Sequence, residues 1–417
     1  MLYFCAKIKK KKTTMQKLLC LLCAALMLGA CRSDEEEEGD GLLNRTVLVY
    51  ISGENTLSSF IDKEFQEMRV GSRGIGNNAL VVYVDDCNSE RPPYIMRIVE
   101  GQTTDSVAME SDQLASDPEV MGRVLSYTAE HFAAHEYGLV LWGHASGWLL
   151  EDSVAWARPM KGYGIDNGRN AYSDTGKWLN MNSLARVLRN WGHPLRFIMA
   201  DCCQFQCIES AYELRNQVDY IIGAPSEIPG VGAPYDTMTP RMFDTTENFY
   251  EGIVDAYYAQ TASGYKVPLS AIRTSELDAL AEATGRALKT FAVPADECPD
   301  LYGLIYYKGR ANDRKRDVMY DMNDFMLHYA PEAEYQAWKP VFDRAVPYRK
   351  MASNWMSNAG YDIRQVDFMS FEMTEERFGG VSMFVPQNRN TSLYNKYNAD
   401  IKQTAWYWAV GMQEIGW

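Results

Sequence analysis

The sequence predicts an α/β fold with a mainly parallel central sheet, and three observations support this prediction. Short apolar runs that are typical of strands alternate with longer segments of helical pattern. The apolar runs are hydrophobic at successive positions, which indicates strands that are buried on both faces, as in parallel sheets. Two of these runs end next to a histidine or a cysteine, which is where open α/β sheets carry their chemistry.

Strands and helices alternate along the first half of the chain. Asp117-Pro118-Glu119 provides a cap and a first-turn proline for a helix that reaches about residue 135. The other predicted elements are a first strand at 47–52, a helix at 58–70, a buried strand at 79–85, a hairpin arm or sheet extension at 94–100, and a strand at 137–143 that leads to His144.

From residue 151 onward the chain contains a polar segment and one more apolar strand, and then becomes mostly helical. Residues 151–179 are polar and rich in glycine, so we interpret them as a long surface loop. A helix with an Asn cap at 182–191 leads into the stretch 196–203, which we interpret as a short buried strand that ends in an acid and two thiols. Further helices are predicted at 248–262, 275–292 and 334–345, a strand that could rejoin the sheet at 379–386, and an aromatic-rich, partly helical end at 392–417.

His144 and Cys203 form the candidate catalytic pair. Each follows an apolar strand, and the segment from Gln204 to Leu214 has helical composition. We therefore expect the Cys203 thiol to lie near the N–H groups of a helix start, which favour the thiolate. A thiolate beside an imidazole is the pair that attack on a carbonyl requires. The alternatives are a cysteine that only fills space and an ordinary polar histidine, and Cys202 is a competing nucleophile.

Four stretches resemble the clostripain family of cysteine peptidases. The resemblance is specific at Asp201–Leu214 and at Leu141–Trp148, and it extends to residues 218–230 and 47–57. It implies a caspase-like fold, in which a mainly parallel sheet is flanked by helices. We expect a catalytic core at 45–240 and a mostly helical C-terminal subdomain at 241–417 that packs on this core.

The resemblance also implies roles for individual residues. The family pattern Asp-x-Cys selects Cys203 over Cys202, and His144 is the matching base. Asp201 matches the acid at the base of the S1 pocket, which implies cleavage after Arg or Lys. The alternative for Asp201 is a structural acid that caps the next helix. Glu227 is a second candidate pocket acid, although its segment departs from the Ser-Glu-Glu form that we expect.

The backbone around the histidine has to accommodate substrate and oxyanion. The N–H groups of Cys203 and Ala145 are candidates for an oxyanion hole. Relatives often have glycine in place of Ala145, and a Cβ there would narrow the hole if the residue needs a positive φ. Gly143 and Gly147 leave room for substrate.

Residues 1–30 predict a lipoprotein signal peptide. They combine basic residues with an apolar run at 18–28 that is too short to span a membrane. Residues 28–31 resemble a lipobox, so we expect lipid on Cys31; an ordinary secretory cleavage site is the alternative. The tether at 31–44 is acidic, which resembles an export signal to the outer face of the outer membrane. We expect a surface-exposed outer-membrane lipoprotein, with a periplasm-facing anchor as the alternative.

Charge and cysteine usage limit the partners. The formal charge is −14, and residues 1–30 hold six lysines and no acids, so the remaining chain is more acidic still. This argues against nucleic acid and is compatible with basic peptide substrates. We expect a monomer that meets a peptide or protein substrate and, through Cys31, the membrane. Five cysteines follow residue 31. Their spacing is not that of a zinc site, whereas a disulfide between two of them is possible. The odd number leaves room for a free thiol.

The predicted function is therefore a lipid-anchored cysteine endopeptidase without a required cofactor or metal. Calcium would rest on family analogy, because no calcium-loop motif is present. A catalytically weak or inactive binding lipoprotein is the alternative, favoured by Ala145 and the additional cysteines, and an acyl transferase could use the same pair. Relatives are activated by cleavage between the histidine and the cysteine, so self-cleavage within residues 151–179 is a further hypothesis.

Overall fold

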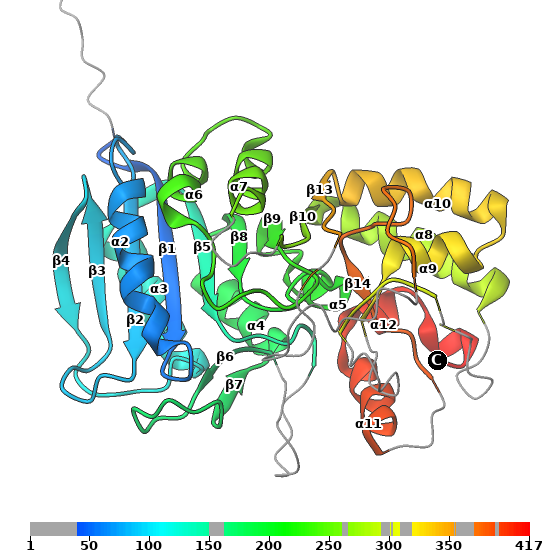
Figure 1. Cartoon of the computed structure of the whole chain (residues 1–417), viewed down its shortest axis with the longest axis horizontal. Helices are drawn as coiled ribbons and strands as arrows, with labels where there is room; N and C mark the ends of the chain where they lie inside the picture. Colours follow the sequence, from blue (N-terminus) through cyan, green and yellow to red (C-terminus); the bar gives the residue numbers. More distant parts are fainter. Residues whose placement is uncertain are drawn as a thin grey trace, which may run out of the picture. The chain divides into compact units, whose positions relative to one another are not determined.

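The longest apolar runs of the sequence form the strands of one large sheet (Figure 1). The structure is a computed structural model that describes residues 40–149, 162–260, 266–292, 301, 303–308, 319–353, 355, 371–387 and 392–417. Residues 43–417 form one unit, and residues 40–42 belong to the preceding one. Outside the described residues lie Cys31, the tether up to residue 39, Cys298, and Arg158 and Lys161, which are basic residues of the segment for which self-cleavage was hypothesised.

The large sheet has nine strands among the described residues, and its centre is parallel. In spatial order the strands are β13 (Tyr348–Lys350), β10 (Leu269–Arg273), β9 (Val218–Gly223), β8 (Leu195–Asp201), β5 (Ala134–Gly143), β1 (Leu43–Gly53), β2 (Ala79–Asp86), β3 (Tyr94–Val99) and β4 (Gln102–Ala108). The five strands from β9 to β2 pair in parallel, and both edges are antiparallel. This confirms the predicted α/β class and the hairpin at the third strand.

Helices cover both faces of this sheet. On one face α2 (Ile61–Gly71), α6 (Tyr235–Met242) and α7 (Phe249–Tyr258) pack in one apolar cluster. On the other face a larger cluster holds α3 (Pro118–His131), α4 (Met181–Trp191), α5 (Ile208–Leu214) and α8 (Leu277–Phe291). The Asp117 side chain accepts a hydrogen bond from Glu119 N and caps α3 as predicted. The N-cap of α4 is Asn180 and not the predicted Asn182, which lies inside the helix, and the cap makes no side-chain hydrogen bond.

The C-terminal part adds strands to the large sheet and builds a small sheet of its own. β10 and β13 extend the large sheet, and neither was predicted. The predicted strand at 379–386 does not rejoin the large sheet. It is reduced to β14 (Ser382–Met383), which pairs with β12 (Met319–Asp321), and β12 pairs with β11 (Tyr306–Lys308). The predicted helices here are confirmed as α7, α8, α10 (Glu332–Ala345), α11 (Ser392–Asp400) and α12 (Ala405–Ala409), and α9 (Met322–Tyr329) adds to them.

Part of the expected surface loop at 151–179 is a two-stranded ribbon. β6 (Tyr163–Asp166) and β7 (Lys177–Leu179) pair antiparallel. β6 is fully buried, although the surrounding sequence is polar. The Tyr163 hydroxyl explains this burial, because it donates to the carbonyls of Tyr50 and Trp142 at the ends of β1 and β5. The ribbon thereby lies against the edge of the sheet from which His144 emerges.

Candidate active site

The register of two neighbouring strands places His144 and Cys203 at the same edge. β5 and β8 pair in parallel, and Trp142 is the partner of Asp201. His144 and Cys203 each follow two residues later, so their backbones leave the sheet at matching positions. Adjacent strands lie about 4.8 Å apart. The two residues, about sixty positions apart in sequence, are thus neighbours in the fold.

The turn that carries His144 is held by β6. Gly143 has a φ of 148°, and a side chain there would meet the Ser52 carbonyl. After the turn, Ser146 N donates to Gly162 O at 3.0 Å and Gly164 N donates to the His144 carbonyl at 2.8 Å. Ala145 lies opposite Tyr163 between these two bonds, and it is absent from the residues with positive φ. The Cβ of Ala145 therefore introduces no backbone strain.

Two residues from distant segments hold the imidazole of His144. Its Nε2 lies 3.1 Å from Thr56 Oγ1 and 3.1 Å from Asp174 Oδ1. The Thr56 hydroxyl donates to the same Asp174 oxygen at 2.6 Å. Since Thr56 gives its proton to Asp174, this network assigns the imidazole proton to Nε2, and Nδ1 is then the acceptor. Partial burial acts to raise the pKa of Asp174, but hydrogen bonds from His144 and Thr56 lower it to about 2.

Three thiols cluster after β8, and they differ in exposure. Cys202 and Cys207 are fully buried, whereas Cys203 is partly exposed. Burial raises the pKa of Cys202 well above its ordinary value and that of Cys207 to about 12, so both remain thiols. Ile228 N points at the Cys203 sulfur from 3.4 Å. The described cysteines, which also include Cys87, form no disulfide.

The helix after Cys203 begins later than predicted. α5 starts at Ile208 with Cys207 as its N-cap, and Gln204 has a φ of 57°. The predicted helix start at Gln204 is therefore wrong, because residues 204–207 form a loop between strand and helix. The N–H of Ile228 takes the place that we had assigned to helix N–H groups.

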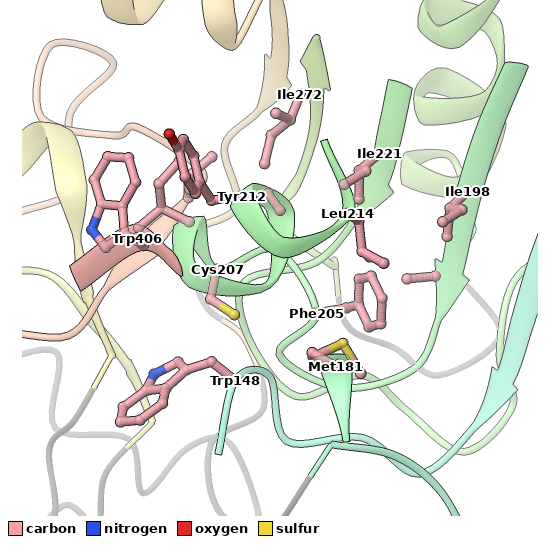
Figure 2. Packing of buried hydrophobic residues seen from close by; sticks show 14 of the residues in the cluster. Trp148, Met181, Ile198, Phe205, Cys207, Tyr212, Leu214, Ile221, Ile272 and Trp406 are labelled. Carbon is pink, nitrogen blue, oxygen red and sulfur yellow. The ribbon is translucent and has the colours of Figure 1, made fainter. Parts of the chain in front are cut away.

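The loop at residues 204–207 is held by contacts with several other segments. Phe205 and Cys207 belong to the same buried cluster as Trp148 (Figure 2). Gln204 N donates to Ser226 O at 2.8 Å. A Cβ on Gly147 would lie 2.8 Å from the Gln204 carbonyl and 3.0 Å from the Cys207 sulfur. The space beside Gly147 is thus occupied by the cysteine loop, and not by room for substrate as we expected.

Asp201, two residues before Cys203, lies beside a second buried acid. Its Oδ2 accepts from Ala233 N and the Tyr235 hydroxyl, each at 3.0 Å, and its Oδ1 accepts from the Tyr257 hydroxyl at 3.1 Å. It does not cap α5, which has no side-chain cap. The neighbour is Glu64 on α2, which is fully buried. Burial and then the charge of Asp201 raise the pKa of Glu64 to about 9.

The segment that carries Glu227 lies beside the cysteine loop, because both neighbours of Glu227 in sequence contact that loop. It is 7% exposed; Ser226 accepts from Gln204 N, and Ile228 N faces Cys203. Asp201, Glu227 and Cys203 thus lie on adjoining segments, and the pocket role of the two acids stays a prediction. Glu64, Thr56 and Asp174 were missed. Thr56 lies in the stretch at 47–57 that carries the resemblance, whereas nothing in the sequence around Asp174 or Glu64 signals a role.

A partly exposed thiol and an imidazole at adjoining ends of parallel strands define the class of cysteine-dependent hydrolases of α/β fold. The chain matches the model of the clostripain family over residues 49–417. None of the curated proteins matches it.

Several solved structures are similar to most of the chain, and two of them are described here by their identity and coverage. A secreted C11 cysteine protease from Bacteroides thetaiotaomicron, in complex with an irreversible peptide inhibitor, is 27% identical with a TM-score of 0.71 over 89% of this chain and 99% of that one. An inactive zymogen C11 protease from Parabacteroides distasonis is 26% identical with a TM-score of 0.69, over 88% and 98%. The chain belongs to the clostripain family and is a cysteine peptidase of caspase-like fold.

Proposed function

We propose that the chain cleaves peptide bonds after Arg or Lys through Cys203 and His144. The Cys203 sulfur attacks the peptide carbonyl carbon, its proton passes to Nδ1 of His144, and a thioester forms. His144 then gives the proton to the leaving amine, and water hydrolyses the thioester. The observation that carries this proposal is the common register of the two strand ends, together with the Ile228 N–H at the Cys203 sulfur.

Asp174 and Thr56 position the imidazole in this scheme. They occupy Nε2, so Nδ1 is left as the nitrogen for the thiol. The carboxylate of Asp174 also stabilises the imidazolium that forms after proton transfer. Glu151 and Asp152, the acids that follow His144 in sequence, lie outside the described residues.

The Ala145 N–H is available for the oxyanion. Within the described part of the chain it donates no hydrogen bond. The two hydrogen bonds that link this turn to the segment of β6 are donated by the N–H groups of Ser146 and Gly164. A free N–H next to the catalytic histidine, aided by the N–H of Cys203, can stabilise the negative oxygen of the tetrahedral intermediate.

Three buried acids support basic specificity. Asp201 and Glu64 are nearly or wholly buried, and in the described residues both carboxyl oxygens of Glu64 have no hydrogen-bond partner. A buried carboxyl group without a partner is costly. The cationic end of an Arg or Lys side chain would supply such a partner, either directly or through Asp201, and Glu227 adds negative potential beside the thiol.

The test is peptide turnover by the full-length protein. Reporter peptides that end in Arg, Lys, Ala or Asp are incubated with wild type, Cys203→Ala and Cys202→Ala. We expect turnover of the Arg or Lys reporters by wild type and Cys202→Ala, and a loss of at least about 10⁴-fold in Cys203→Ala. Turnover of another reporter alone rejects the basic pocket. No turnover of any reporter favours the binding lipoprotein.

We further propose that lipid on Cys31 anchors the peptidase in the outer membrane with its core at the cell surface. The lipobox-like residues 28–31 and the acidic tether support this assignment. Among the described residues, no helix has the length and apolar character that a membrane span requires. Metabolic labelling with an alkynyl fatty acid tests the anchor: label that persists in Cys31→Ala contradicts it.

A further inference from the structure

Residues 228–232 lie against the two buried acids Asp201 and Glu64, which we call the acid pair. Residues 228–231 are partly exposed, and Gly232 behind them is buried. Gly232 has a φ of 62°, and a Cβ on it would lie 2.9 Å from Asp201 Oδ2 and 3.1 Å from Glu64 Oε1. Asp201 and Glu64 are 2% and 0% exposed. A side chain from outside therefore reaches the acid pair only after a neighbouring segment has moved, and residues 228–232 are the segment that touches both acids.

Lys63 connects this segment to α2, the helix that carries Glu64. Its Nζ donates to the Val231 carbonyl at 3.3 Å and forms an ion pair with Glu67 Oε1 at 2.5 Å. The pair with Glu67 lies one turn apart on the same helix, whereas the bond to Val231 crosses to the covering segment. The Lys63 side chain is 36% exposed, so it has room to turn. Lys63 can therefore release Val231 and remain paired with Glu67.

Lys63 is also a cation that acts on the acid pair. Burial raises the pKa of Asp201 and of Glu64, and the positive charge of Lys63 acts against this effect on both carboxyl groups. The three groups that donate to Asp201 are an N–H and two tyrosine hydroxyls, all uncharged. Both carboxyl oxygens of Glu64 lack a hydrogen-bond partner within the described residues. The ammonium of Lys63 thus supplies a positive charge that the hydrogen-bond donors of the acid pair do not.

We propose that Lys63 is a specificity-determining residue that competes with the basic side chain of the substrate. In the free peptidase its ammonium compensates the acid pair and holds Val231 in place. An Arg or Lys side chain that enters brings a charge of its own, so Lys63 releases Val231 and stays with Glu67. A neutral side chain brings no such charge and leaves the segment closed. This inference rests on the proposed function, in which Asp201 and Glu64 bind the basic side chain.

The direction of the effect separates this role from a structural one. Removal of a cation beside a site that binds a cation strengthens binding, because two like charges near a protein surface repel each other. For charges several ångströms apart, this repulsion corresponds to about a three- to tenfold change in affinity. A lysine that only stabilises α2 through its pair with Glu67 would, when replaced, lower the Tm slightly and leave the preference for basic side chains unchanged.

The experiment measures binding in full-length Cys203→Ala protein, with and without Lys63→Met. Two peptide amides that differ only in their last residue, Arg or its uncharged analogue citrulline, are titrated by calorimetry. We expect Lys63→Met to lower the Kd of the Arg peptide at least about threefold and to change that of the citrulline peptide by less than about twofold. The gain should shrink when NaCl is raised from about 50 to about 500 mM, because salt screens exposed charges.

Three further variants complete the design. Lys63→Gln, which is also uncharged, should repeat the gain, and Lys63→Arg should keep the parent affinity. Lys339→Met removes the lysine of a similar pair with Asp343 on α10 and should change neither Kd. The proposal is overturned if the Arg peptide binds no tighter to Lys63→Met than to the parent, if both peptides gain equally, or if the Arg peptide binds to neither protein.

Turnover separates this inference from the peptidase mechanism. A gain that is specific for the Arg peptide, in a protein whose wild type turns over no reporter, supports the role of Lys63 and rejects the proposed cleavage. In an active wild type, we expect Lys63→Met to lower the KM of the Arg reporter at least about threefold and to change kcat by less than about twofold. An unchanged KM in that case rejects the role of Lys63 and leaves the proposed function intact.

Discussion

The cysteine side and the histidine side of the site are built in different ways. The Cys203 sulfur and the start of its loop are contacted by Ile228 and Ser226, from the nearly continuous stretch through β8, α5 and β9, and only the end of the loop, at Gln206 and Cys207, also meets Ser270, Ser382 and Gly147. The imidazole of His144 is held by Thr56 after β1 and Asp174 between β6 and β7. The environment of the thiol thus follows from local sequence, whereas that of the imidazole depends on tertiary contacts.

We expect the largest effect on activity from a substitution on the histidine side of the site. Asp174→Asn removes the charge that holds Nε2, and we expect kcat/KM to fall about 10- to 100-fold with little change in KM. The loss is smaller than the ~10⁴-fold of serine triads, because a thiol is intrinsically easier to ionise. Asp174→Glu should restore part of kcat, and the neighbouring Ser173→Ala, at a partly exposed position, should stay within about twofold. Equal kcat in Asp174→Asn and wild type would show that the imidazole needs no such partner.

A change of stability with pH should sharpen the picture of the cysteine side. The pKa of Glu64 is about 9 in the folded protein and near 4.5 when unfolded, so the folded state binds the extra proton between these values. The free energy of unfolding therefore falls as pH rises through this window, by about 1.4 kcal/mol for each pH unit.

Glu64→Gln cannot lose a proton and should escape this loss. We expect its Tm to exceed that of wild type by about 2 °C or more at pH 8.5 and to approach it at pH 4.5. Asp62→Asn, an exposed acid on the same helix, is the control and should follow the wild-type profile. Parallel melting profiles of Glu64→Gln and wild type would contradict the burial argument.

The smallest effect is expected at the junction of the two sides. Ala145 does not have a positive φ, so glycine offers its backbone no relief. Ala145→Gly should change kcat/KM by less than about threefold, measured with the Arg and Lys reporters. A gain of tenfold or more would show instead that the Cβ narrows the oxyanion hole.

The central strands could be predicted because each carries a strong apolar signal. β1, β2, β5 and β8 are buried along almost their whole length, and a buried strand needs apolar residues on both faces. The edges give no such signal. β4 is almost entirely exposed and polar, and β13 has only three residues.

The same contrast explains which site residues could be predicted. His144 and Cys203 each follow a predictable strand, so their place at the sheet edge is visible in the sequence. Asp174 lies between the two strands of a ribbon that is fixed by two hydrogen bonds from the Tyr163 hydroxyl to β1 and β5, so its place beside His144 depends on tertiary contacts. Glu64 lies on a helix whose other acids are exposed or paired, and pattern alone does not distinguish it.

The parallel pairing of β5 with β8 has a consequence for a chain cut between residues 149 and 162. The N-terminal piece would keep β1, β2 and β5, and the C-terminal piece would keep β6, β8 and β9. Each piece alone would expose a row of unpaired backbone groups along a mostly apolar strand, β5 in one piece and β8 in the other. The two polypeptides would therefore stay associated as a non-covalent heterodimer. This heterodimer would elute from gel filtration like the uncut chain and would separate only in denaturant.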